Sequence, residues 1–239
     1  MLQSYHDFMC GETAPFVRVL EDFFRKRVTR SLAVTSESNL EMAIELLWFE
    51  EAQCVPQMCL VVDSTKPGRE GRGGFVDIFV GNSQRQLTTA NPVLVMELKN
   101  VTLCSLWKAQ QRDPDVDPRS SKDYEPIAMT LRDATEDQLL AMKYTYYDKE
   151  EREWIKLQVK DAFQAATAQL NKYMNIISMG RVTSTRPGVL NDRITCRDGG
   201  CDVLLGYVII CVGGARVLCR PTTRKVTFYS FEVVHPQDT

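Results

Sequence analysis

Three charged residues interrupt apolar runs between residues 74 and 100. Asp77 stands inside FVDIFV, and Glu97 and Lys99 stand near the end of VLVMELKN. Carboxylates taken out of water are costly unless they are paired or bind a cation, and two carboxylates side by side repel each other. A divalent metal resolves both costs. Mg²⁺ suits such a site because it takes oxygen ligands and is often held by one or two carboxylates plus substrate phosphate.

The period of a β-strand predicts how these side chains meet. Successive side chains of a strand point to opposite faces, so Asp77 is expected to share a face with the phenylalanines two residues before and after it. Glu97 and Lys99 share a face for the same reason. If strands 74–81 and 92–100 pair as a hairpin through the loop between them, all three charged groups converge on one side of a sheet.

The lysine completes a set of groups that could cut a phosphodiester. Lys99 is the only lysine of the chain that stands two residues after a carboxylate. It can orient or deprotonate an attacking water that a metal has acidified, and metal and ammonium together stabilise charge on the phosphate oxygens. A purely structural alternative is a buried Asp77–Lys99 salt bridge with Glu97 at a strand end.

Hydrophobic periodicity and turn residues predict the elements that carry these groups. We expect a single domain over residues 1–239 with an N-terminal helix at 13–30. The segment 101–155 has charge-rich, proline-rich stretches and is expected to be an exposed insertion that decorates the core. The other expected elements are a helix at 36–52, a strand at 55–64, a Gly-rich loop at 65–74, the two strands above, a long helix at 156–179 and three more strands after residue 200.

The order of these elements and motifs resembles the PD-(D/E)XK nuclease superfamily, which has the restriction-endonuclease-like fold. The segment AATAQLNKYM resembles the Gln-x-x-x-Tyr signature of a subset that includes fungal-type nuclease modules. The resemblance covers residues 36–100 and 156–220. It implies an α/β fold with an αβββαβ core, in which a central mixed sheet is flanked by helices.

The resemblance also implies a function. It predicts a Mg²⁺- or Mn²⁺-dependent endonuclease or exonuclease that binds nucleic acid, DNA before RNA, and it leaves a homodimer or an ATPase-type partner protein open. The Gly-rich loop offers Arg72, and the Gln-x-x-x-Tyr helix offers Tyr173, for contact with the substrate. By this resemblance Asp77 and Glu97 hold the metal, Glu41 assists it through water, Lys99 serves the attacking water and Gln169 helps to orient the site.

Composition sets limits on the other function classes. The chain is 44% hydrophobic and 25% charged, as ordinary globular proteins are, and its net charge of -2 shows that it is no polycation. We find neither a signal peptide nor an apolar run of about 18 residues, so we expect the nucleus or cytoplasm, no membrane partner, and reduced cysteines. The only histidines, His6 and His235, lie near the ends, which argues against a Ser-His-Asp or Cys-His hydrolase.

Two other functions stay open at this point. One is a catalytically inactive module that keeps the nuclease fold and binds nucleic acid or protein as an effector or adaptor. The other is a glycosidase, which would need two carboxyl groups facing each other at about 5–10 Å across a sugar cleft and no metal.

Overall fold

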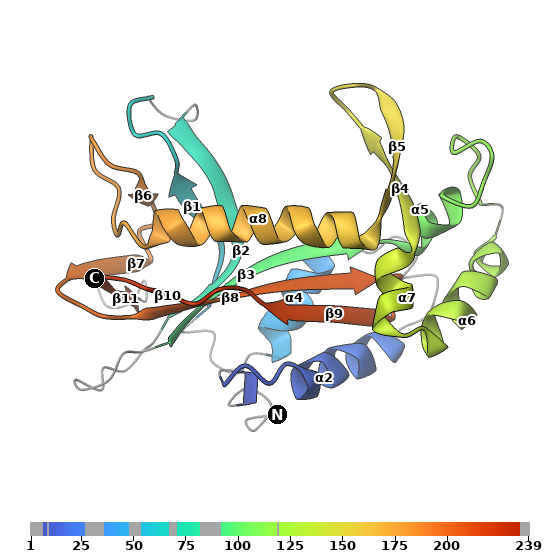
Figure 1. Cartoon of the computed structure of the whole chain (residues 1–239), viewed down its shortest axis with the longest axis horizontal. Coiled ribbons are helices and arrows are strands. Elements are labelled where there is room, and N and C mark those ends of the chain that lie inside the picture. The colour runs from blue at the N-terminus through green and yellow to red at the C-terminus, as the bar shows by residue number, and fades with distance from the viewer. Residues whose placement is uncertain are drawn as a thin grey trace.

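The computed structural model describes residues 7–8, 10–26, 36–47, 54–66, 71–81, 92–118 and 120–234. Its centre is a seven-stranded mixed sheet (Figure 1). Strands β1 (Cys54–Val61), β2 (Arg72–Val80) and β3 (Pro92–Val101) are antiparallel neighbours. Strand β8 (Val203–Val212) then pairs with β3 in parallel, and β9 (Arg216–Pro221) returns antiparallel to β8. The expected hairpin of the second and third strands is confirmed.

Helices cover both faces of this sheet. The long helix α8 (Val159–Ile177) crosses one face, while α2 (Ala14–Arg25) and α4 (Glu37–Leu47) lie on the other (Figure 1). The parallel pairing of β3 with β8 requires a crossover between them, and α8 lies in that crossover. The central mixed sheet flanked by helices that the sequence predicted is therefore present.

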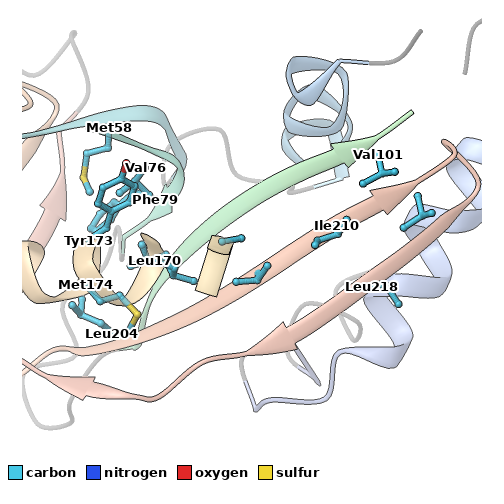
Figure 2. Packing of buried hydrophobic residues seen from close by; sticks show 14 of the residues in the cluster. Met58, Val76, Phe79, Val101, Leu170, Tyr173, Met174, Leu204, Ile210 and Leu218 are labelled. Atoms are coloured by element: carbon cyan, nitrogen blue, oxygen red, sulfur yellow. The ribbon is translucent and has the colours of Figure 1, made fainter. Parts of the chain in front are cut away.

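Each face has its own apolar core. On the α2 and α4 face, Leu40 and Ile44 of α4 meet Leu94 and Met96 of β3. On the α8 face, helix side chains pack onto β1, β2 and β8. Figure 2 shows this second cluster, in which Leu170, Tyr173 and Met174 of α8 lie near Met58, Val76 and Leu204 of the sheet.

Helix α8 begins later than the expected residue 156. Residues Glu153–Gln158 form strand β5, which pairs antiparallel with β4 (Lys143–Asp148). At the start of the helix the backbone N–H of Gln158 donates to the Asp161 carboxylate at 2.9 Å, which satisfies one of the N–H groups at the helix N-terminus. The β4–β5 hairpin extends away from the sheet near the start of α8 (Figure 1).

The segment 101–155 is not merely an exposed decoration, and this part of the expectation is wrong. It contributes eight buried residues to the core on the α8 face, because short helices between its charge-rich loops bury apolar side chains. These helices are α5 (Leu103–Lys108), η3 (Ser121–Tyr124), α6 (Glu125–Asp133) and α7 (Glu136–Ala141). The buried residues are Val101, Leu103, Leu106, Tyr124, Ile127, Leu131, Ala134 and Leu139.

The remaining short strands lie toward the C-terminal end of α8. Strand β6 (Gly188–Val189) pairs with β1, and β10 (Lys225–Val226) pairs with β8. Strand β11 (Tyr229–Val233) leaves the main sheet and pairs with β7 (Ile194–Asp198). Residues 225–234, which the sequence predicted as one strand, therefore form the two short strands β10 and β11.

All eight cysteines are free thiols. Among the residues that the structure describes, no helix has the length and apolar character needed to cross a bilayer. Parts of the expected first and second helices, residues 27–30 and 48–52, lie outside the described residues, as does the expected loop 82–91.

Candidate functional site

Strands β2 and β3 part at Asp77. Their paired residues are Val80 with Leu94, Phe79 with Val95, and Ile78 with Met96, and the ladder ends there. One step further, the backbone N–H of Leu98 donates to Oδ2 of Asp77 at 2.7 Å. The Asp77 carboxylate therefore accepts a strand N–H at the point where the two strands separate, which places it beside the Glu-x-Lys segment as the sequence predicted.

The predicted alternation of β2 fails at Asp77. Val76 and Phe79 are both fully buried in the core on the α8 face, although they are three residues apart, and Phe75 is 47% exposed. The expectation that Phe75, Asp77 and Phe79 share one face is therefore wrong. Before Asp77 an even-numbered side chain, that of Val76, faces α8, and after it an odd-numbered one, that of Phe79, does so. The side chains of β2 therefore change faces at this aspartate.

Strand β1 turns over at the same level. Val55 and Met58 both enter the core on the α8 face, again at a spacing of three. Between them Gln57 has a φ of 49°. Because Val55 pairs with Phe79 and Met58 pairs with Val76, the irregular residues of the two strands lie opposite each other.

Lys99 and Glu97 form a close ion pair inside the site. The Lys99 Nζ lies 2.7 Å from Oε1 of Glu97 and 3.8 Å from Oε1 of Glu37. The Glu97 side chain is 1% exposed, and its second oxygen, Oε2, is buried with no hydrogen-bond partner in the described part of the chain. The ion pairs of Lys99 thus go to the two glutamates, which differs from the structural alternative of an Asp77–Lys99 bridge.

The electrostatics of the site show an excess of negative charge. Burial and then the charge of Asp77 raise the pKa of Glu97 to about 7, although Lys99 opposes the shift. Burial also raises the pKa of Asp77, against the Leu98 N–H and Lys99. Burial alone would lower the pKa of Lys99, but the charges of Glu97, Glu37 and Asp77 raise it above its usual value. Lys99 is therefore a cation at neutral pH, and it does not neutralise the carboxylates completely.

Helix α4 adds two carboxylates to the site. Burial raises the pKa of Glu37 and of Glu41, and the charge of Asp77 contributes to both shifts. Both oxygens of Glu41 accept from the Gln57 amide, at 3.2 and 3.1 Å. Glu37, one helical turn earlier, is the carboxylate that approaches Lys99.

Sequence reasoning missed Glu37 and Gln57. A glutamate in the first turn of a helix is ordinary, because it favours the helix dipole, so Glu37 has no distinctive signal beyond its place one turn before Glu41. Gln57 lies in an apolar run, where a polar residue with a positive φ cannot be recognised from the sequence.

The Gln-x-x-x-Tyr pair packs α8 against β2, through Tyr173 and Gly74. The Gln169 amide donates to the Tyr173 hydroxyl at 3.0 Å. That hydroxyl lies so close to Gly74, whose φ is 143°, that a Cβ there would be 2.1 Å from it. Burial raises the pKa of Tyr173, and the charges of Glu97 and Asp77 add to the shift. Gln169 thus hydrogen-bonds the Tyr173 hydroxyl, and its predicted role in orienting the site stays a prediction.

Arg72 is the remaining predicted site residue. It is the first residue of β2, so the Gly-rich loop ends before the expected residue 74. The side chain of Arg72 and residues 67–70 of the loop lie outside the described part of the structure. Its contact with substrate stays a prediction.

The residues at this site suit a divalent cation with oxygen ligands. Within the described ranges no cluster of three or more His, Cys, Asp or Glu side chains has the arrangement of a metal centre. Mg²⁺ needs fewer protein ligands than that, because waters and substrate phosphate complete its shell. Asp77 and Glu97 supply two adjacent carboxylates, and the buried, unsatisfied Oε2 of Glu97 is an oxygen that a cation would satisfy.

Comparisons with known protein families, with curated proteins and with solved structures find no match. The family resemblance of the motifs therefore stays a prediction, and the function must be inferred from the site itself.

Proposed function

We propose that this chain is a metal-dependent nuclease that hydrolyses phosphodiester bonds through Asp77, Glu97 and Lys99, with DNA as substrate before RNA. The observation that carries the proposal is the state of Glu97. The charge of Asp77 raises the pKa of this buried carboxylate, one of its oxygens is paired with Lys99, and the other has no hydrogen-bond partner in the described residues. A bound Mg²⁺ or Mn²⁺ would satisfy that oxygen and remove the repulsion between the acids.

The order of elements supports a restriction-endonuclease-like core. When the elements between β3 and α8 and the short strands β6 and β7 are set aside, α4, the three antiparallel strands, α8 and the parallel strand β8 follow one another in the αβββαβ order expected of that core. The acids come from the second and third strands of this series, and the Gln-x-x-x-Tyr pair comes from the second helix. The proposal therefore needs no rearrangement of the predicted motif order.

Each residue has a role that follows from its position. A divalent cation, when bound, neutralises charge on the phosphate and acidifies an attacking water. Asp77 and Glu97 would hold this cation. Lys99 carries a positive charge at neutral pH, so it stabilises charge that develops on the phosphate oxygens and orients the water by donating hydrogen bonds. Glu37 and Glu97 hold the ammonium in place.

One observation favours the catalytically inactive alternative. The Lys99 ammonium already neutralises part of the charge of Glu97 and Glu37, so the protein alone partly stabilises the acids without any metal. A module that only binds nucleic acid or protein could keep this arrangement as a structural ion pair. Turnover distinguishes the two functions.

The test is cleavage of supercoiled plasmid, single-stranded DNA and RNA by the full chain, with Mg²⁺ or Mn²⁺ and with a chelator. We expect metal-dependent cleavage that Asp77→Asn, Glu97→Gln and Lys99→Ala each abolish or reduce at least about 100-fold. The control is Lys149→Ala, which removes an exposed lysine from the β4–β5 turn and should cut like the wild type. No cleavage by the folded wild type would favour the binding module, and cleavage that survives the chelator would contradict the proposal.

A further inference from the structure

Gln57 holds a strained backbone conformation in the middle of a strand. Its φ of 49° lies in the left-handed region, which glycine adopts readily and glutamine rarely does. Residues on both sides of it pair regularly with β2. Such strain persists only where the surroundings fix it, and it clusters at functional sites.

The side chain of Gln57 joins two acids of the candidate site. Its amide nitrogen lies 3.2 and 3.1 Å from the two oxygens of Glu41, and the same side chain hydrogen-bonds the Asp77 carboxylate. An amide nitrogen has two N–H donors, which is the number needed to serve two carboxylates at once. Gln57 therefore links helix α4 to strand β2 through strand β1.

We infer that Gln57 is a positioning residue of the metal site, which fixes the Asp77 carboxylate for the cation. The inference rests on the proposed function. Asp77 accepts from the Leu98 N–H at 2.7 Å and from the side chain of Gln57, which stands opposite it between the pairs Pro56–Ile78 and Met58–Val76. Removing a group that orients a metal-binding carboxylate usually lowers the metal affinity or the activity.

The same geometry changes the role of Glu41. Because both of its oxygens accept from Gln57, Glu41 anchors the amide and acts on the cation through Gln57 and Asp77. The family resemblance predicted a contact with the metal through water. Here Glu41 is a second positioning residue, and Glu37 is the α4 acid that faces Lys99.

The backbone strain of Gln57 allows a sharp experiment. Gln57→Gly removes the amide and also relieves the left-handed conformation, so the substitution should leave the melting temperature unchanged or higher. Arg152→Gly is a matched control. Arg152 has a φ of 56° and is exposed, near the turn of the β4–β5 hairpin. Both variants gain the same backbone relief, and only the first loses a contact to Asp77.

The measurement is Mn²⁺ affinity of the full chain by calorimetry, alongside thermal unfolding and cleavage. We expect the Kd of Gln57→Gly for Mn²⁺ to rise about 10- to 100-fold, while Arg152→Gly binds Mn²⁺ as the wild type does. Gln57→Asn keeps an amide and tolerates a positive φ, so it should recover part of the affinity. Glu41→Gln should weaken binding less when Gln57 is already glycine, because the two residues act on Asp77 as one unit.

The outcomes separate this inference from the proposed function. If the wild type binds and uses Mn²⁺ but Gln57→Gly matches Arg152→Gly within twofold, the positioning role is overturned and the nuclease proposal stands. If both Gln57→Gly and Gln57→Asn lose stability and bind Mn²⁺ with wild-type affinity, Gln57 is structural only. If the wild type binds no Mn²⁺, the proposed metal site itself fails.

Discussion

Glu97 is the residue that dominates the electrostatics of the site. A carboxylate that is 1% exposed, next to a second acid, is unfavourable when it is ionised. The pKa of about 7 expresses that cost, since the folded protein retains a proton that the unfolded chain releases near its usual value of 4.5. A cation would remove this penalty, and Lys99 removes only part of it.

This pKa predicts how stability depends on pH when metal is absent. Because the folded pKa of Glu97 is raised, the folded state binds more protons between about pH 4.5 and 7, and the free energy of unfolding falls as the pH rises through that range. Asp77, Glu37 and Glu41 have pKa shifts of the same sign. Glu97→Gln has no ionisable group there, so we expect it to be more stable than the wild type at pH 8 with a chelator, by on the order of 2–3 kcal/mol.

Urea denaturation at pH 5 and pH 8 measures this difference. The advantage of Glu97→Gln should shrink at pH 5, and adding Mn²⁺ at pH 8 should stabilise the wild type but not the variant. Glu150→Gln, at an exposed position in the β4–β5 turn, is the control and should change neither value. A metal-free wild type that is as stable as Glu97→Gln at pH 8 would show that the Glu97 carboxylate is already fully compensated by Lys99.

Lys99 is expected to have opposite effects on binding and on turnover. Its ammonium lies 2.7 Å from Glu97, so its positive charge opposes a cation on the same carboxylate. Lys99→Ala should therefore bind Mn²⁺ more tightly than the wild type, by calorimetry, while kcat for cleavage falls about 10²- to 10³-fold because the cation that faces the phosphate is gone. Weaker Mn²⁺ binding in Lys99→Ala would mean that the lysine supports the site only as a structural ion pair.

At the scale of elements, the site depends on where strands part and turn. The sequence predicted the β2–β3 hairpin, because two apolar runs flank a loop, and it predicted that Asp77 would meet the Glu-x-Lys segment. It could not predict that β1 and β2 both turn over at Gln57 and Asp77, since the alternation of side chains assumes a regular strand. The ion pair of Glu37 with Lys99 could not be predicted either, because it depends on how α4 packs against the end of β3.

The contact of α8 with β2 gives a prediction at this scale. Gly74→Ala would place a Cβ 2.1 Å from the Tyr173 hydroxyl and strain a backbone with a φ of 143°, so we expect a loss of roughly 1–3 kcal/mol in the free energy of unfolding. Part of that loss comes from the clash between the new Cβ and the side chain of Tyr173. In a Tyr173→Ala background the same substitution should cost at least about 0.5 kcal/mol less, measured by a double-mutant cycle in urea. Equal costs in both backgrounds would show that α8 is not seated on β2 through this tyrosine.

At the scale of the whole molecule, the mixed sheet with helices on both faces agrees with what the family resemblance of the motifs implied. The apolar runs at the positions of β3 and β8 lie in the centre of the sheet, and Leu40, Ala43 and Ile44 are buried on the face that α4 turns to it. The role of the segment 101–155 did not follow, because short helices with one or two buried leucines resemble charged loops in composition. Its packing beside α8 is decided by contacts between residues far apart in the chain.

The net charge of the whole molecule predicts how it meets nucleic acid. A chain of net charge -2 has no general attraction for a polyanion, so affinity must come from a limited set of phosphate contacts and the bound cation. We expect Asp77→Asn to bind single-stranded or duplex DNA in fluorescence anisotropy with an affinity that falls linearly on a log–log plot against salt. No binding to either DNA would point to a partner other than nucleic acid, and binding that does not change with salt would contradict phosphate contacts as the source of the affinity.

The most direct test of the central claim is the anomalous signal of Mn²⁺ in a crystal of this protein soaked with that ion. The account predicts a peak within coordination distance, about 2.0–2.2 Å, of a carboxylate oxygen of Asp77 and of Oε2 of Glu97, with Lys99 Nζ directed at the water shell of the ion. A fully soaked crystal with no peak at these two carboxylates, and Lys99 still paired with Glu97, would contradict it.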